Sequence, residues 1–239
     1  MMKAMIGAYR DGATKARVVL LAAAVGAALP GCAGRNSLLG EGPPYQLPFL
    51  LRFTDSAARS MGLPLLRESA LQESVKEVRV WTGFGTVQPD FMLRFQITAD
   101  GALTGTLLAY AIRDPSDEKY DRWIGAVLGA MCSSVRSDVG LASCAADASR
   151  EIRWKAVYRN LVADELWNLP DESELPKPKY TMSDGSGIVV ELRDGRGYRA
   201  YEYLNPGMRE GLAARRAVRL QEIAGGVVAP VFARASPEE

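Results

Sequence analysis

The sequence of 239 residues contains no histidine. A Ser-His-Asp triad, a Cys-His pair and a zinc site with imidazole ligands are therefore excluded for this chain. An excess of positive charge is also missing, because 29 Lys and Arg residues stand against 28 Asp and Glu residues. A formal net charge of +1 is not typical of nucleic-acid-binding proteins, so we expect no nucleic-acid partner.

No residue class is extreme in abundance. Hydrophobic residues make up 48% of the chain and charged residues 24%, with 23 Gly and 13 Pro. These proportions exclude a collagen-like, a coiled-coil and a largely disordered chain. They are those of a globular protein that is long enough to bury a full hydrophobic core.

The N-terminus has the pattern of an export signal. Four basic side chains, Lys3, Arg10, Lys15 and Arg17, precede the uncharged apolar run Val18–Leu29. As a helix this run would span about 18 Å, well short of the hydrocarbon core of about 30 Å. A basic segment followed by a short apolar run is typical of a secretory signal rather than of a transmembrane helix.

The apolar run ends in Leu29-Pro30-Gly31-Cys32, which resembles the lipobox of bacterial lipoprotein precursors. The resemblance implies that residues 1–31 are a signal peptide and that Cys32 carries diacylglyceryl and palmitate-type groups. Several acyl chains hold a protein firmly, so the implied partner is a membrane, bound through the lipid anchor. Ala33, where Asp favours inner-membrane retention, implies the outer membrane, with the protein facing the periplasm. The alternative is an unlipidated signal peptide.

The remainder of the chain divides into three parts. Residues 32–48 are rich in Gly and Pro and predict a flexible tether. Residues 49–234 predict a single α+β domain, and residues 235–239 predict a loose tail.

Two cysteines remain when the lipobox cysteine is set aside, Cys132 and Cys144. Export into an oxidising compartment favours a structural disulfide between them. The alternative is a redox-active pair, but the long separation is unlike the Cys-x-x-Cys spacing that lowers a thiol pKa.

Apolar side chains alternate with polar ones over residues 91–98, and an Asp-Gly turn leads to a partner strand over 103–112. A second hairpin group is expected over residues 184–204. The order of elements predicts an α+β fold, with an antiparallel sheet of about six strands built from two hairpin groups and helices packed on one face.

Helical spacing predicts helices between the two hairpin groups, the second of them running to Leu169. A last helix is expected over residues 207–224. The short apolar run Val227–Phe232 predicts an edge strand, because Pro230 cannot donate a hydrogen bond to a neighbouring strand.

Carboxylate chemistry needs no histidine and is therefore still open to this chain. Asp171, Glu172 and Glu174 follow a predicted helix end at Pro170. Two carboxylates about 5–9 Å apart can hydrolyse a glycosidic bond. Adjacent acids in a proline-bounded loop are more typical of a solvated turn than of a catalytic site. A carboxylate-dependent envelope glycan hydrolase is therefore kept as the alternative function and not as the first.

Other motifs predict no cofactor, no metal site and no catalytic residues. Asp114, Asp117 and Glu118 do not have the spacing of an EF-hand loop. Gly83-Phe84-Gly85 and residues 194–197 do not open a helix after a buried parallel strand, and they lack the lysine of a phosphate loop.

The candidate binding surface is aromatic. Strand alternation places Arg199, Tyr201 and Tyr203 on one face, and Trp81 is expected near them. Aromatic rings with arginines can hold a sugar ring or a partner peptide; the alternative is packing beneath a helix. The sequence as a whole favours a non-enzymatic binding module of the cell envelope, whose partner is another envelope protein or a glycan.

Overall fold

The computed structural model describes residues 49–69, 75–84, 89–114, 116–138, 140–178 and 185–235. All of these belong to a compact unit that runs from Gln46 to Glu239. The lipobox with Cys32, the tether over 32–48 and the tail from residue 236 lie outside the described residues.

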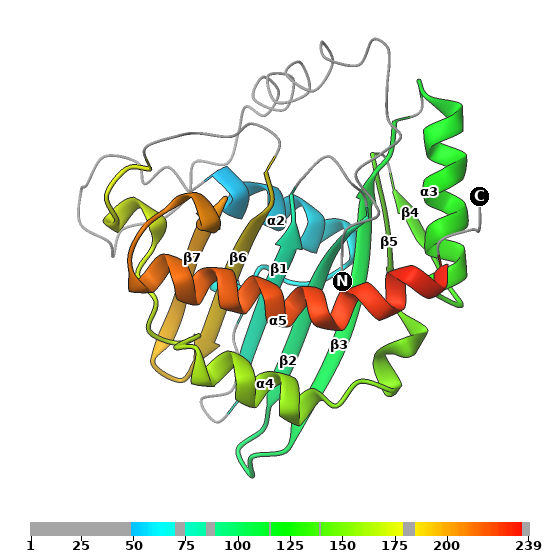
Figure 1. The fold of residues 1–239 in the computed structure, drawn as a ribbon. Helices are drawn as coiled ribbons and strands as arrows, with labels where there is room; N and C mark the ends of the chain where they lie inside the picture. The colour runs from blue at the N-terminus through cyan, green and yellow to red at the C-terminus, as the bar shows by residue number, and fades with distance from the viewer. Residues whose placement is uncertain are drawn as a thin grey trace, which may run out of the picture. The chain divides into compact units, whose positions relative to one another are not determined.

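A sheet of antiparallel strands is the centre of this unit (Figure 1). Among the described residues it has seven strands in the order β4-β5-β3-β2-β1-β6-β7. The strands are β1 (Lys76–Gly83), β2 (Asp90–Ile97), β3 (Leu103–Ile112), β4 (Arg136–Asp138), β5 (Leu141–Ala145), β6 (Gly187–Asp194) and β7 (Gly197–Leu204). The α+β class with an antiparallel sheet is therefore confirmed, with seven strands in place of about six.

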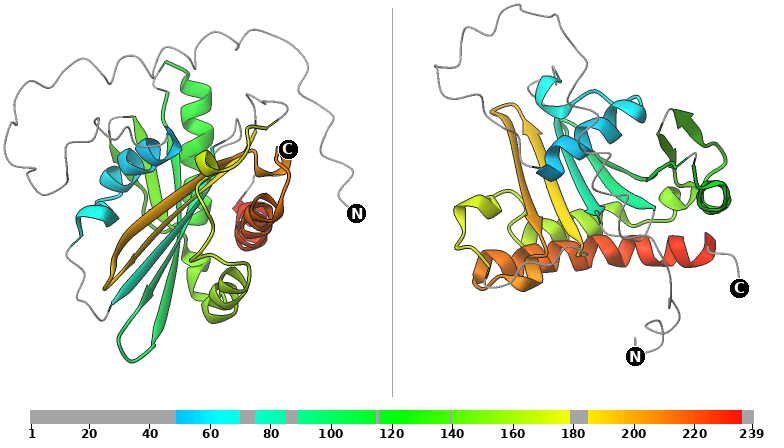
Figure 2. Two further views of the ribbon diagram at one scale, coloured as in Figure 1. Left: turned by 90° about the vertical axis from the view of Figure 1, so that its left-hand side faces the viewer. Right: turned by 90° about the horizontal axis from the view of Figure 1, so that it is seen from above.

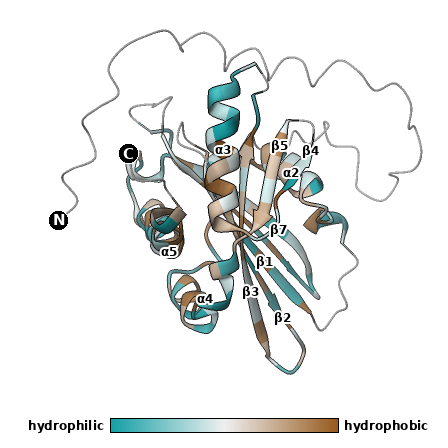
Figure 3. Cartoon of the chain, turned by 90° about the vertical axis from the view of Figure 1, so that its right-hand side faces the viewer, coloured by the Kyte–Doolittle hydropathy of each residue, from teal (hydrophilic) through white to brown (hydrophobic). Residues whose placement is uncertain are grey.

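Helices cover both faces of the sheet, whereas the sequence predicted helices on one face. The helices are α2 (Phe49–Ser60), α3 (Glu118–Met131), α4 (Trp154–Ala163) and α5 (Leu212–Ala235). Figures 2 and 3 show α4 and α5 on one side of the sheet and α2 on the other. The central strands carry apolar side chains on both faces, and each apolar face needs a cover of its own.

Two hydrophobic cores result, one on each side of the sheet. The larger core joins α3, α4 and α5 to the sheet through buried side chains such as Val80, Leu93, Leu107, Leu128, Val190 and Leu220. The smaller core lies under α2 and includes Leu50, Leu51, Ala57, Trp81, Met92 and Val189. Side chains that alternate along β1, such as Val80 and Trp81, therefore enter different cores.

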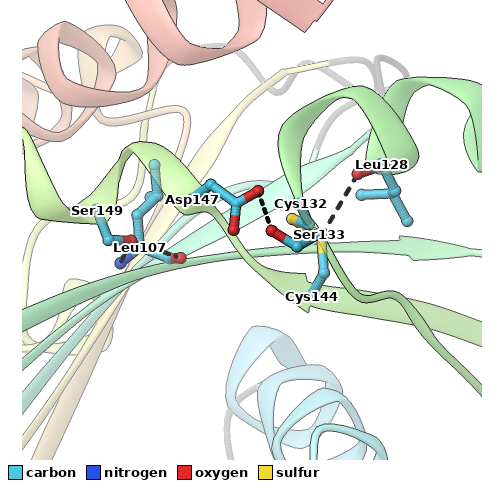
Figure 4. Close-up of a disulfide and its surroundings, with 7 residues drawn as sticks. All are labelled: Leu107, Leu128, Cys132, Ser133, Cys144, Asp147 and Ser149. Atoms are coloured by element: carbon cyan, nitrogen blue, oxygen red, sulfur yellow. Dashed lines mark hydrogen bonds between the residues drawn. A yellow bond between two sulfur atoms is a disulfide. The ribbon is translucent and has the colours of Figure 1, made fainter.

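The disulfide between Cys132 and Cys144 is present, as predicted (Figure 4). Cys132 follows directly after α3, and Cys144 lies on β5, so the bond attaches the helix to the sheet. Ser133 Oγ donates a 2.6 Å hydrogen bond to Asp147 Oδ2 beside it. Closing a loop of this length stabilises a fold by about 3 kcal/mol in the chain-entropy model.

The short strands β4 and β5 were not predicted, and with the loss of the predicted strand over 227–232 they account for the difference in strand number. β5 has the sequence Leu-Ala-Ser-Cys-Ala, in which small residues replace the alternation that marks a half-buried strand. Four of its five residues are buried, because β5 pairs with both β3 and β4 and is covered on both faces. Its pairing is therefore set by distant parts of the chain.

The predicted edge strand Val227–Phe232 is wrong. These residues belong to α5, which continues through Pro230 to Ala235. Val231 is buried in the larger core, and the ring of Phe232 meets Phe91 edge-on with centroids 6.4 Å apart. Packing of the last two turns offsets the hydrogen bond that proline removes from a helix.

Candidate functional site

The expected aromatic binding face is buried, so this prediction is wrong for the tyrosines. Tyr201 and Tyr203 are 2% and 0% exposed. Their hydroxyls donate to Leu166 O and Pro170 O, both at 2.7 Å. The two side chains belong to the larger core and fix the segment after α4 against β7.

Trp81 lies on the opposite face of the sheet from these tyrosines, and it is fully buried. Trp81 is opposite Val189 on β6, and Val189 is opposite Glu202 on β7. Because directly paired residues share a face, Trp81 shares one with Glu202 and not with Tyr201. The expectation that Trp81 lies near the tyrosine face is therefore wrong as well.

Arg199 remains at the surface, on the same face of β7 as the tyrosines. Its Nη1 donates a 2.5 Å hydrogen bond to Trp167 O, and its Nη2 donates to Leu169 O. The Arg199 guanidinium thus links the loop that follows α4 to strand β7.

A buried charged network occupies the α2 side of the sheet. Glu77 accepts hydrogen bonds from Arg79 Nε and from Arg94 Nε and Nη2, each at 2.8 Å. Next to it, Glu191 accepts from Trp81 Nε1 at 2.7 Å and from the Tyr198 hydroxyl at 3.1 Å. Burial raises the pKa of the Glu191 carboxyl. Most of these groups pair with one another inside the fold, and Arg79 Nη1 donates to Pro64 O, while Arg79 Nη2 is buried without a hydrogen-bond partner among the described residues. The arrangement is that of a structural network.

The acidic loop after Pro170 binds the edge of the sheet. Asp171 Oδ2 accepts a hydrogen bond from Glu202 N at 2.9 Å, and Glu172 Oε2 accepts from Leu204 N at 2.8 Å. Glu174 Oε1 accepts from Asp171 N at 2.8 Å and completes a capping box. The three carboxylates thus cover backbone N–H groups of β7 and of their own loop, a use typical of a protected edge strand.

Glu202 holds the N-terminus of α2 in place. Its Oε2 accepts a 2.9 Å hydrogen bond from Leu51 N, and its side chain faces the smaller core. Burial raises the pKa of this carboxyl to about 7, while the Leu51 amide lowers it and Asp171 and Glu172 raise it further. A raised pKa is a property of a general acid, but both this carboxylate and Asp171 are bound to backbone amides.

The titration of Glu202 predicts a pH-dependent stability. Its pKa is higher in the folded than in the unfolded chain, so its contribution is present below about pH 4.5 and is lost as the pH rises through about 7. We expect the melting temperature of the wild type, relative to Glu202→Gln, to fall between pH 5 and 8. Glu118→Gln, at an exposed site, is the control. A constant difference across this range would contradict the assignment.

One end of the sheet is rich in positive charge. Pairing places Lys76 opposite Ile97, and Ile97 opposite Leu103, so these residues mark a single end of the strands. The β6–β7 hairpin lies at the same end, since Glu77 is opposite Arg193. Figure 1 shows α4 beside this end, which we call the hairpin end.

Two surface grooves open at the hairpin end. The first, of about 500 Å³, is the Trp154 groove, and its lining residues are Leu103, Arg153, Trp154, Lys155, Ala156 and Arg159. The second, of about 440 Å³, is the Trp167 groove, and Lys76, Trp167, Arg196, Tyr198 and Arg199 are among its lining residues. Arg199 is thus the predicted binding residue that lies in a groove, where it contacts the loop with Trp167 while its guanidinium stays 5.6 Å from the centroid of the buried Tyr201 ring.

The Trp154 side chain is fixed in position on the sheet. Its Nε1 donates a 2.8 Å hydrogen bond to Ser149 O, and its ring meets Phe95 edge-on with centroids 5.4 Å apart. The ring lies against Gly105, where an added Cβ would be 2.0 Å from Trp154 Cδ2. Glycine therefore permits this close approach, and the first turn of α4 is a rigid wall of the groove.

The sequence carries one signal for the Trp154 groove, beyond the predicted site residues. Residues 152–163 include two arginines and a lysine but no acid. On a helix with a tryptophan at its first position, these cations gather around one end. Leu103 reaches the same groove through the pairing register of the strands. That register depends on contacts between distant segments and cannot be predicted from the local sequence.

Within the part of the chain that the structure describes, no cluster of acidic or cysteine side chains has the arrangement of a metal site. None of the described helices is both long enough and apolar enough to cross a bilayer. Comparison of the chain with protein-family models, with curated proteins and with solved structures gives no match.

Proposed function

We propose that this protein is a lipid-anchored, non-enzymatic binding module of the bacterial cell envelope and that its hairpin end contacts the ligand. The single observation that carries the binding role is the Trp154 groove. There a fixed tryptophan is surrounded by Arg153, Lys155 and Arg159, all exposed and none with an ion pair among the described residues.

The carboxylates support binding over hydrolysis. Asp171, Glu172 and Glu174 accept hydrogen bonds from backbone amides, and Glu202 accepts one from α2. None of these four side chains lines either groove. A glycosidase needs two carboxyls that face a common substrate, whereas these four are bound to backbone amides.

The envelope location is supported by the sequence of the N-terminus. The lipobox-like Leu29-Pro30-Gly31-Cys32 predicts an acylated Cys32 in the outer membrane, facing the periplasm. We expect the full chain made in a Gram-negative host to enter the detergent phase on phase partitioning. Cys32→Ser should remain in the aqueous phase or keep residues 1–31. Equal partitioning of the two proteins would contradict the lipid anchor.

The binding role is tested by capture from a membrane extract. The immobilised wild type should retain envelope material that the double variant Lys155→Gln/Arg159→Gln does not retain. Arg215→Gln is a matched control, because Arg215 is exposed on α5 and lines neither groove. Retention that is equal for the wild type and the double variant would refute the hairpin end as the binding surface.

A further inference from the structure

The three cations of the Trp154 groove have no carboxylate partner among the described residues; Arg52, Arg59 and Arg215 are also unpaired, but they line neither groove. Arg122, Arg216 and Arg234 each face a carboxylate, at 3.5, 3.4 and 3.0 Å. Glu151, the acid next to α4 in the sequence, is the partner of Arg234. The groove cations have no such partner, so they are free to bind a negative charge from outside the described chain.

Positive charge without a counter-charge in the described chain is concentrated in the first turn of α4. Its N-cap residue Arg153 makes no capping hydrogen bond through its side chain, and the turn has no acidic residue. A helix N-terminus carries partial positive charge, so a cation there is unfavourable. Lys155 and Arg159 are four residues apart, which places two like charges on one face of the helix. A bound anion would attract both cations and the helix N-terminus and so would offset these two repulsions.

The walls of the groove define what else the ligand carries. Leu103, Trp154 and Ala156 add an apolar surface beside the cations. The volume of about 500 Å³ is much larger than a bare phosphate ion. The site therefore has room for an uncharged body, such as a sugar or a glycerol, that lies on the indole ring while its anionic group meets the cations.

A phosphoryl group fits the donors better than a carboxylate does. Phosphate offers three acceptor oxygens and up to two negative charges. Arginine donates to it through two parallel N–H bonds. Two arginines and a lysine line this groove. Their side chains are the donors, because the Trp154, Ala156 and Val157 amides at the start of α4 already donate to Ile152 O and Arg153 O.

We infer that the Trp154 groove binds an organic phosphate, in which a phosphoryl group is carried on a sugar or glycerol body. This inference rests on the proposed binding function and names its ligand class. The phosphoryl group meets Arg153, Lys155 and Arg159, and the uncharged body lies on Trp154. A soluble sugar phosphate and a phospholipid headgroup share this chemistry.

The test is titration calorimetry of the full chain in neutral detergent at low salt. Glucose 1-phosphate should bind, whereas glucose should not, and glucuronate should bind at least tenfold more weakly. Each of Lys155→Gln and Arg159→Gln should weaken glucose 1-phosphate about tenfold, the scale of one charge-assisted hydrogen bond. Arg215→Gln should bind as the wild type does.

Vesicles distinguish the two sources of the phosphate. If the ligand is a headgroup, the Cys32→Ser protein should bind phosphatidylglycerol vesicles and not phosphatidylcholine vesicles, and Lys155→Gln should abolish this binding. If the ligand is a soluble phosphate, glucose 1-phosphate should bind and the two kinds of vesicle should give the same result.

Three outcomes would overturn the inference. Glucuronate as strong as glucose 1-phosphate would show a general anion surface. An equal loss in Arg215→Gln would show attraction by overall charge. Absence of binding to glucose 1-phosphate and to phosphatidylglycerol would remove the ligand class. In that last case, groove-dependent capture from the membrane extract would leave the proposed function standing, so the two failures are distinguishable.

The variants are expected to fold. Lys155 and Arg159 are exposed, and their replacement removes like-charge repulsion near a helix N-terminus. Their melting temperatures should therefore equal or slightly exceed that of the wild type. A stabilised variant that has lost its ligand is typical of a functional surface, whereas a structural role would lower the melting temperature.

Discussion

Glu77→Gln is expected to lower the free energy of unfolding by about 3–5 kcal/mol, the scale for breaking a buried ion pair. Burial tends to raise the pKa of the Glu77 carboxyl, but the hydrogen bonds and charges of Arg94 and Arg79 outweigh it and lower the pKa. The Arg79 side chain is 0% exposed. Without the Glu77 charge, this guanidinium would stay buried without its hydrogen-bonded anion, and the Glu191 carboxyl opposite it on β6 would remain as a counter-charge.

Chemical denaturation measures the effect, and Glu118→Gln is its control, since that side chain is 84% exposed in a surface ion pair with Arg122. The control should change stability by less than about 0.5 kcal/mol. The double variant Glu77→Gln/Arg79→Gln should lose less than the sum of the two single variants, because the pair is coupled. A loss below about 1 kcal/mol for Glu77→Gln would show that the network contributes little.

Tyr201→Ala is expected to cost about 3–5 kcal/mol of stability, as for other emptied aromatic sites in a core. The ring is buried, and its centroid is 6.2 Å from that of Tyr203 in an edge-on contact. Tyr201→Phe keeps the ring but removes the hydrogen bond to Leu166 O, so it should cost about 1–2 kcal/mol.

Thermal melting together with capture from a membrane extract separates packing from binding at Tyr201. If Tyr201 serves packing, the capture by correctly folded protein should be unchanged at temperatures well below melting. An unchanged melting curve with lost capture would instead support the aromatic surface that the sequence predicted. Tyr198→Phe is a useful comparison, because Tyr198 lines the Trp167 groove and donates to the buried Glu191.

Alternation within a strand was readable from the sequence, and pairing between strands was not. Arg199, Tyr201 and Tyr203 do share a face of β7, as predicted. Whether Trp81 on β1 lies on that same face depends on the pairing register, which places Trp81 opposite Val189. This register is fixed by packing across the sheet, and a shift of one residue would reverse it.

Local rules also failed where distant contacts decide the structure. Pro230 predicts the end of a helix, yet Val231 and Ala235 are buried in the larger core and the helix continues. The α+β class and the disulfide were predictable because they depend on composition, order and a pair of cysteines. The groove required the spatial meeting of Leu103 with α4, which no local pattern records.

If the proposed lipid anchor is present, the placement of α2 determines where mechanical load enters the fold. The helix begins at Phe49, directly after the residues that we propose as the tether, and its first turn is held by Glu202 through Leu51 N. Tension on the anchor would reach this helix before it reaches any strand, and it would load the Glu202 bond first. Antiparallel strands joined by many backbone bonds resist such a pull better than one amphipathic helix does. The helix α2 would then act as the yielding element, detaching under force while the disulfide-linked sheet stays intact.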